Sequence, residues 1–273
     1  MPELPEVEVV LQGLASLLID RKIERVHTSG LRLRQPIPVA DLVLWGVGSR
    51  VTELRRRGKY LIITLDNAAR LVFHLGMTGR LGLFPAGSSS VRHDHLCLAL
   101  DNQMEMRFND TRRFGCIQVL TPGHDEGRFF SHLGPEPLLG NFSVTHLRDM
   151  AVKRRQPVKM LLMDNRVVVG IGNIYANEIL HEAEVSPFRP SCEVSDTEWE
   201  VIVEKTRQVL TRAIAAGGST IADFINASGK PGYFQLEFTV YGRGGQPCLR
   251  CSSRIEKMVM AGRATYSCPG CQK

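Results

Sequence analysis

The chain has 273 residues, of which 43% are hydrophobic and 23% are charged, so it has enough apolar material for at least two packed domains. Its formal net charge of +6 favours a polyanionic partner, and residues 238–273 carry six Lys and Arg against one Glu. No apolar run approaches the ~18 residues of a membrane span, and the acidic N-terminus is unlike a signal or transit peptide. We therefore expect a soluble cytoplasmic protein.

The chain begins with a proline followed by closely spaced glutamates. Once Met1 is removed, Pro2 becomes a secondary amine, which is nucleophilic near neutral pH and forms a charged iminium with a sugar aldehyde carbon. Glu3 is placed to protonate a leaving oxygen or base, and Glu6, one helical turn away, is placed to orient the pair. The alternative interpretation is an extended arm that is only stiffened by its prolines.

Helical spacing of apolar residues predicts an amphipathic helix over residues 7–19. Short runs rich in Val, Ile, Leu and Phe follow, with Asp66-Asn67 and Asp101-Asn102 as candidate hairpin turns. Many short strands without intervening helices predict a sandwich or barrel. The predicted strands are residues 22–26, 42–47, 50–54, 60–65, 69–74, 80–84, 95–100, 105–109 and 115–120.

A basic cluster, Arg55-Arg56-Arg57-Gly58-Lys59-Tyr60, runs into one of these strands. For most of the cluster, the alternative interpretation is that its arginines are simply exposed to solvent. Lys59 differs if the strand points it toward Pro2, because an ammonium there would bind a phosphate or shuttle a proton.

The composition changes after about residue 130, and residues 134–141 have the Gly and Pro content of a linker. Beyond it, apolar periodicity predicts helices over residues 143–152, 157–164, 173–183, 195–216 and 220–226. Asp196 suits the positive N-terminal end of the fourth of these helices, and Gly217-Gly218 end it. Residues 227–236 are expected to form a loop and residues 237–241 a strand.

Two glycines, Gly170 and Gly172, precede the helix that is predicted from Asn173. Backbone N–H groups at such a helix start form an anion site, to which Asn173 adds a side-chain donor. The basic run Lys153-Arg154-Arg155 lies nearby in sequence and would grip phosphate. The alternatives are an ordinary capped helix and a solvated helix end.

Four of the seven cysteines form two C-x2-C pairs separated by sixteen residues: Cys248, Cys251, Cys268 and Cys271. This spacing is typical of a zinc ribbon, in which two tight turns each present two thiolates to one tetrahedral ion. Disulfides are the alternative, but the chain has no secretory features. The remaining cysteines are small core or surface residues.

Several further motifs are spread over the chain, and together they are highly specific. They are Pro2-Glu3-Leu4-Pro5-Glu6-Val7-Glu8, Gly58-Lys59-Tyr60, His93-Asp94-His95, Asp110-Thr111-Arg112-Arg113-Phe114-Gly115, Gly134-Pro135-Glu136-Pro137, Gly172-Asn173-Ile174-Tyr175, Val240-Tyr241-Gly242 and the four-cysteine module with Arg263 inside it. With these motifs the chain resembles the bacterial formamidopyrimidine-DNA glycosylases, DNA-repair enzymes that remove 8-oxoguanine and ring-opened purines.

The resemblance implies an α+β multidomain fold with DNA held in a cleft. Residues 1–133 would form an N-terminal β-sandwich catalytic domain, residues 134–142 a linker, residues 143–236 a helix–two-turn–helix domain and residues 237–273 a zinc finger with one structural Zn²⁺. It also implies that Pro2 attacks C1′ of the damaged nucleotide with Glu3 as acid/base partner. Lys59 would assist β-elimination and Arg263 δ-elimination.

The resemblance further implies a set of DNA contacts made by a monomeric protein. The phosphate contacts would be His93, Lys153, Arg154, Arg155, Asn173, Tyr241 and Arg263. A base must leave the stack before its sugar is attacked. Met77, Arg112 and Phe114 suit the vacated space as an apolar plug, a fork of donors and an aromatic wedge. Core packing at strand positions is the alternative for Met77 and Phe114.

Two other functions remain open from the sequence. Endonuclease VIII-type glycosylases, which act on oxidised pyrimidines, usually begin Pro-Glu-Gly-Pro-Glu, whereas this chain has Leu4 in place of that glycine. The pair Arg112 and Phe114 also favours the purine branch. A catalytically silent damaged-DNA-binding protein is the second alternative, and the intact Pro2, Glu3 and Lys59 count against it.

Overall fold

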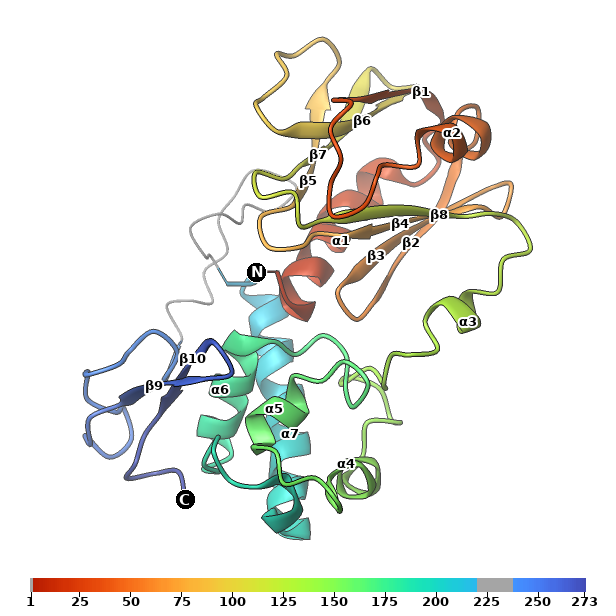
Figure 1. Ribbon diagram of the computed structural model, residues 1–273. Coiled ribbons are helices and arrows are strands. Elements are labelled where there is room, and N and C mark those ends of the chain that lie inside the picture. Colours follow the sequence, from red (N-terminus) through yellow and green to blue (C-terminus); the bar gives the residue numbers. More distant parts are fainter. Residues whose placement is uncertain (1, 220–237) are drawn as a thin grey trace. The chain divides into compact units, whose positions relative to one another are not determined.

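The computed structural model describes residues 2–219 and 238–273, and the chain divides into two compact units (Figure 1). Unit 1 comprises Met1–Phe130 and Ala216–Tyr233, and unit 2 comprises Ser131–Ala215 and Phe234–Lys273. The helix predicted over residues 220–226 and the loop predicted over residues 227–236 lie outside the described residues. The domain boundaries inferred from the sequence stay a prediction.

The described residues of unit 1 form two four-stranded antiparallel sheets, with strand orders β1-β6-β7-β5 and β2-β3-β4-β8 (Figure 1). The predicted β-sandwich is therefore confirmed as a domain of two sheets, and both candidate hairpin turns join paired strands. The strands are β1 (Ile23–Thr28), β2 (Val51–Arg57), β3 (Tyr60–Leu65), β4 (Arg70–His74), β5 (Arg80–Pro85), β6 (Asp94–Leu100), β7 (Met104–Asn109) and β8 (Cys116–Leu120).

Helix α1 (Leu4–Leu18) carries the N-terminus into this β domain. It starts three residues earlier than predicted, because Pro5 fits the first helical turn, where no intrahelical N–H bond is needed. The helix contacts β2 and β3 of one sheet and β5 of the other. Each fully buried apolar side chain contributes about 1.5–3 kcal/mol. The helix therefore anchors the terminus firmly through Val7, Val10, Leu14 and Leu18.

The strand predicted over residues 42–47 is wrong. Residues 39–46 are helical, as α2 (Val39–Asp41) followed by a π-helical turn, η1 (Leu42–Gly46). This turn buries Leu42 and Gly46, four positions apart, and leaves Leu44 69% exposed. A short apolar run does not distinguish a strand from a helical turn, and here the helical period applies.

The sequence did not predict the short helix α3 (Glu126–Phe129) at the end of unit 1. The Asp125 side chain accepts the Arg128 N–H and caps this helix. Glu126 forms ion pairs with Arg55 and Arg70, so part of the basic cluster of β2 serves structure. Arg56 in the same cluster is also paired, with Glu8 at 2.8 Å.

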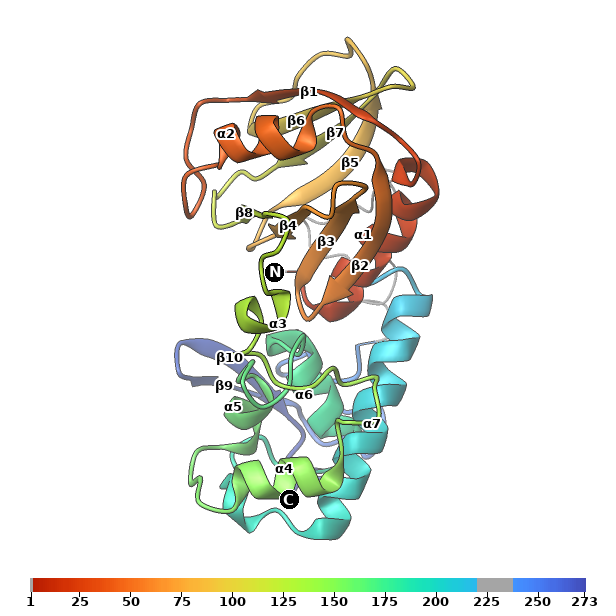
Figure 2. The ribbon, with the colours of Figure 1, turned by 90° about the vertical axis from the view of Figure 1, so that its right-hand side faces the viewer.

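In the part of unit 2 that the structure describes, four α-helices lie at the predicted places, with α4 and α6 packed against the long α7 (Figure 2). The helix α7 begins after Ser195, whose hydroxyl accepts the Glu198 N–H while the Glu198 carboxylate accepts the Ser195 N–H. It ends before Gly217, at φ 80°, as predicted. The helices are α4 (Val144–Ala151), α5 (Val158–Leu162), α6 (Asn173–Glu182) and α7 (Asp196–Ala215), with a 3-10 turn η2 (Ser191–Glu193).

The C-terminal part of unit 2 contains an antiparallel hairpin of β9 (Glu256–Met260) and β10 (Arg263–Ser267). The strand predicted over residues 237–241 is wrong for its described residues. The N–H groups of Thr239, Val240 and Tyr241 all donate to the Glu178 carboxylate on α6, so none of them joins a β ladder. Within residues 2–219 and 238–273, no helix has the length and apolar character needed to cross a bilayer.

Candidate active site and DNA-contact residues

The N-terminal residues proposed for catalysis lie buried at the start of α1. Pro2 is buried and Glu3 is 1% exposed. The Glu3 N–H donates to Glu6 Oε2 at 2.8 Å, while Glu6 Oε1 accepts both the N–H and the hydroxyl of Ser219 at 2.8 Å. Gly218 permits this approach, because a Cβ there would lie 3.3 Å from Glu6 Oε1. Glu6 therefore ties the start of α1 to residues 218–219.

Lys59 lies at the tip of the β2–β3 hairpin, in a turn that Gly58 allows with φ 57°. Its side chain is half-buried. Burial, followed by the positive charges of Lys59 and Arg34, lowers the pKa of His74 to about 4. Two cations therefore lie around a neutral imidazole, whose ring packs 4.9 Å from that of Tyr60. The approach of Lys59 to Pro2 stays a prediction.

The neutral state of His74 predicts a pH-dependent contribution to stability. The pKa falls from 6.5 to about 4 on folding, so the unfolded chain binds the proton more readily. The contribution is full above about pH 6.5 and is lost as the pH falls toward 4, up to about 3 kcal/mol. We expect urea unfolding to lose stability more steeply over this range in the parent than in His74→Gln. Parallel pH profiles of unfolding for the parent and His74→Gln would contradict the lowered pKa of His74.

Met77, Arg112 and Phe114 lie in two turns of unit 1, residues 75–79 after β4 and residues 110–115 after β7. Met77 is 37% and Phe114 46% exposed, so core packing at strand positions does not describe them. The Arg112 guanidinium lies over the Phe114 ring, 4.8 Å from its centroid. A cavity of about 370 Å³ is lined by Arg34, His74, Gly76, Met77 and Phe114.

The backbones of His93 and Arg113 are both hydrogen-bonded to the backbone of Asp110. His93 is half-buried, has φ 76°, and its carbonyl accepts the Asp110 N–H at 3.1 Å. Arg113 follows Arg112 in the turn and does not lie on a strand. It lies in the turn with φ 57°, and its N–H donates to the Asp110 carbonyl, because the chain reverses here between β7 and β8.

Three of the residues proposed as phosphate contacts in unit 2 lie around β10. The Asn173 amide donates to the Ala264 carbonyl at 3.0 Å, next to the exposed Arg263. The ring of Tyr241 lies 5.2 Å from that of Tyr266 on the same strand. The first of these contacts joins residues 91 positions apart in the chain.

The basic run after α4 is only partly exposed. Lys153 and Arg155 are exposed, whereas Arg154 is half-buried and pairs with Asp164 at 3.5 Å. Their approach to the start of α6 stays a prediction.

Sequence reasoning assigned no role to two buried charged residues that hold the C-terminal module. Glu178 is 2% exposed and accepts four hydrogen bonds from residues 239–241, which fixes the backbone of Tyr241. Lys159 is 1% exposed, and its ammonium donates to the Ala264 carbonyl and to the Thr265 hydroxyl, next to Arg263. Their only signal in the sequence is a charge among apolar helix residues, which does not identify the partner.

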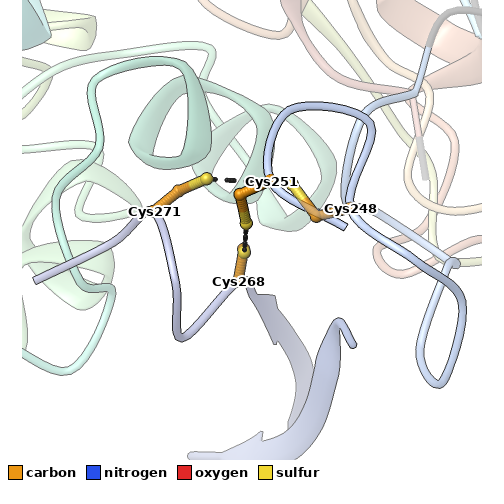
Figure 3. A group of neighbouring side chains, drawn as sticks. All are labelled: Cys248, Cys251, Cys268 and Cys271. Atoms are coloured by element: carbon orange, nitrogen blue, oxygen red, sulfur yellow. Dashed lines mark hydrogen bonds between the residues drawn. The ribbon is translucent and has the colours of Figure 1, made fainter. Parts of the chain in front are cut away.

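The four cysteines of the C-x2-C pairs converge from two turns (Figure 3). Their sulfurs all lie within 4.8 Å of one another, with 3.3 Å between Cys251 and Cys268 and 3.8 Å between Cys248 and Cys271. Zn–S bonds of about 2.3 Å in a tetrahedron place the sulfurs about 3.8 Å apart, so the set fits one zinc ion. The thiols are not joined as disulfides.

A histidine of α6 lies beside this cluster. His181 Nε2 is 3.6 Å from Cys248 Sγ, and its Nδ1 is 2.9 Å from the Thr239 hydroxyl. The Thr239 hydroxyl in turn donates to Glu178. The His181 side chain therefore packs against the cysteine cluster and connects it to Thr239 and Glu178.

The chain matches three family descriptions in succession. Residues 1–117 match the formamidopyrimidine-DNA glycosylase N-terminal domain, residues 133–225 its H2TH domain, and residues 245–273 the zinc finger found in FPG and IleRS. These matches confirm the expected fold class of a β domain, a helix–two-turn–helix domain and a four-cysteine zinc finger. With the sulfur geometry, the last match also confirms the structural zinc site.

Known proteins resemble the chain from end to end. The formamidopyrimidine-DNA glycosylase of Hahella chejuensis is 44% identical over 273 residues and covers 100% of both chains. The MutM (FPG) protein of Thermus thermophilus is 37% identical, with a TM-score of 0.87 and coverage of 99% and 98%. A Lactococcus lactis FPG variant in complex with Fapy-dG DNA is 31% identical, with a TM-score of 0.93 and full coverage of both chains. Because the similarity spans the whole chain and each of its three domains, the chain belongs to the formamidopyrimidine-DNA glycosylase family.

Proposed function

We propose that this protein is a bifunctional DNA glycosylase and AP lyase that removes 8-oxoguanine and formamidopyrimidine lesions from duplex DNA. Membership of the family supports this function, as does the Lactococcus relative in complex with Fapy-dG DNA. The observation that carries the proposal is the buried pair Pro2 and Glu3, which Glu6 holds at the start of α1. A secondary amine beside a buried carboxyl group suits covalent attack on a sugar carbon.

Each catalytic residue has a defined task in this proposal. The nitrogen of the mature Pro2 bonds to C1′ as the bond to the damaged base breaks, and the amine loses its proton. The bond between C1′ and the ring oxygen of the sugar then breaks, which leaves a charged iminium, and Glu3 protonates the leaving base or the sugar oxygen. Lys59 then assists β-elimination, and Arg263 assists δ-elimination. Glu6 orients the terminus through its bonds to the Glu3 N–H and to Ser219.

The DNA is held by contacts that do not read its sequence and by residues that replace the flipped nucleotide. Met77, Arg112 and Phe114 enter the vacated space, and their exposure in two adjoining turns supports this role. The phosphate contacts are His93, Lys153, Arg154, Arg155, Asn173, Tyr241 and Arg263.

The zinc-binding cysteines serve structure rather than chemistry. Cys248, Cys251, Cys268 and Cys271 would hold the ion with four thiolates, so no ligand position is left for a reacting water. The ion stabilises the module that carries Arg263. We further propose that the protein acts as a monomer on DNA in the bacterial cytoplasm, associated with the nucleoid.

A nicking assay on defined duplexes tests this function. We expect cleavage of an end-labelled duplex that contains 8-oxoguanine opposite cytosine, with products of successive β- and δ-elimination. A duplex with an oxidised pyrimidine is the control for endonuclease VIII-type activity, and faster cleavage of that duplex would favour this alternative. Binding to the 8-oxoguanine duplex without any cleavage would instead indicate a catalytically silent protein.

Arg112 is predicted to read the base left opposite the lesion. An orphan cytosine presents O2 and N3 as acceptors, which the donor fork of arginine meets, whereas an orphan adenine presents an amino donor. The mismatch leaves buried polar groups unpaired at a cost of about 1–3 kcal/mol. We expect the parent to cleave 8-oxoguanine opposite cytosine about 10- to 100-fold faster than opposite adenine.

Single substitutions test this assignment. Arg112→Ala is expected to lose activity and most of the preference, while Arg113→Ala, the exposed neighbour in the same turn, keeps the preference. If the two duplexes differ as much for Arg112→Ala as for the parent, Arg112 is not the reader.

A further inference from the structure

A buried carboxylate joins the two turns that carry the proposed void-filling residues. Asp110 is fully buried, at 0% exposure. Its Oδ1 accepts the hydroxyl of Thr78 at 2.5 Å, and its Oδ2 accepts the N–H of Gly115 at 2.7 Å. Thr78 follows Met77, and Gly115 follows Phe114. The Asp110 carboxylate therefore bonds to the residue that follows each of the two apolar void-filling residues, Met77 and Phe114.

The Thr78 hydroxyl extends this connection to Arg112. A carboxylate only accepts, so the single hydroxyl proton of Thr78 is donated to Asp110. A lone pair of the hydroxyl oxygen then accepts the Arg112 N–H at 3.0 Å. The backbone of Arg112 is thus fixed to the turn of Met77 by one hydroxyl group, although Arg112 lies 34 positions after Thr78 and in a different turn.

The two turns also touch through their backbones. A Cβ at Gly76 would lie 2.4 Å from the carbonyl carbon of Phe114 and 2.5 Å from the backbone nitrogen of Gly115. His95 also contacts the start of the second turn, where its Nε2 lies 3.0 Å from the Asp110 carbonyl oxygen. A displacement of one turn is therefore transmitted to the other.

We propose that Thr78 is a positioning residue that sets the opposite-base specificity of the enzyme through Arg112. The proposal rests on the proposed function, since it requires that Arg112 reads the orphan base. Two rigid donors must meet two acceptors of the orphan cytosine, so the backbone from which the arginine extends must be held in place. The Thr78–Asp110 pair holds that backbone.

The matched pair Thr78→Val and Thr78→Ser isolates the hydroxyl group. Valine has the shape of threonine but leaves Asp110 Oδ1 and the Arg112 N–H without the bonds that the hydroxyl makes. Serine retains the hydroxyl. We expect Thr78→Val to lower the cytosine-over-adenine ratio of kcat/KM about tenfold. Thr78→Ser is expected to keep the parental ratio. Thr52→Val, at an exposed hydroxyl on β2 that donates to the Thr64 carbonyl of β3, is the control for the same chemical change elsewhere.

The experiment measures kcat/KM on 8-oxoguanine duplexes with either opposite base, together with amide hydrogen exchange at Arg112. Faster exchange at Arg112 and a reduced ratio in Thr78→Val, with parental values of both in Thr78→Ser, support the proposal. A parental ratio in Thr78→Val overturns it, even if both rates fall, because a purely structural role lowers the two rates together. A parent that cuts neither duplex refutes the proposed function, and exchange at Arg112 then still tests the hydroxyl link by itself.

Discussion

A chain that retains Met1, or that carries an uncleaved N-terminal extension, is expected to lose base excision and strand cleavage by at least about a thousandfold. The Pro2 nitrogen is then part of an amide, whose lone pair is delocalised and not nucleophilic. Pro2 is buried beside Glu3 at the start of α1, so the reactive nitrogen belongs to a well-packed part of unit 1. Global stability is not expected to depend on the state of this nitrogen.

The comparison uses one protein with a protease-removable extension, assayed before and after cleavage that exposes Pro2. Nicking rates on an 8-oxoguanine duplex and thermal unfolding are measured on both forms. We expect activity to appear only after cleavage, with similar unfolding temperatures. Equal activity in the extended form would show that the terminal nitrogen is not the nucleophile.

Loss of zinc is expected to weaken DNA binding by at least about 100-fold, with little effect on the stability of unit 1. The buried apolar cluster of the C-terminal module consists of Val240, Cys248, Ile255 and Cys268, two of which are zinc ligands. So small a core does not hold the hairpin of β9 and β10 without the metal. The module carries the basic excess of residues 238–273 and the proposed contact Arg263, so its unfolding removes phosphate contacts.

Cys248→Ala tests this expectation, with Cys192→Ala as a matched control at an exposed cysteine outside the cluster. Bound zinc is measured by metal analysis, and DNA affinity by fluorescence anisotropy at a fixed salt concentration, because phosphate contacts depend on salt. The control is expected to keep both zinc and affinity. Parental affinity of Cys248→Ala in the absence of zinc would contradict the structural role of the metal.

Features encoded by short-range patterns were predicted well. The four cysteines form a site because each pair lies in one tight turn, and the amphipathic helix α1 follows from its own spacing. Gly217 marked the end of α7 in the sequence, because glycine readily adopts the positive φ that the chain has there. The apolar run of residues 42–47 was misassigned, because its length suits either a strand or the helical turn that it forms.

Features that depend on pairing across the chain were not predictable in this way. Thr78 bonds to Asp110 and to Arg112, 32 and 34 positions later, and a hydroxyl in a turn gives no sign of either partner. Residues 237–241 were predicted as a strand, yet the N–H groups of residues 239–241 bond to Glu178, about 60 positions earlier. Buried polar residues are satisfied by partners that only the folded chain brings near.

Pro2 is proposed to form the covalent bond to the damaged nucleotide. Borohydride reduction during the reaction with an 8-oxoguanine duplex converts an iminium into a stable adduct, and mass analysis of the digested complex locates the attachment. We expect an adduct on the N-terminal peptide of chains that begin at Pro2, with the sugar on the proline nitrogen. An adduct on a lysine such as Lys59, or cleavage of the duplex without any trapped adduct, would contradict it.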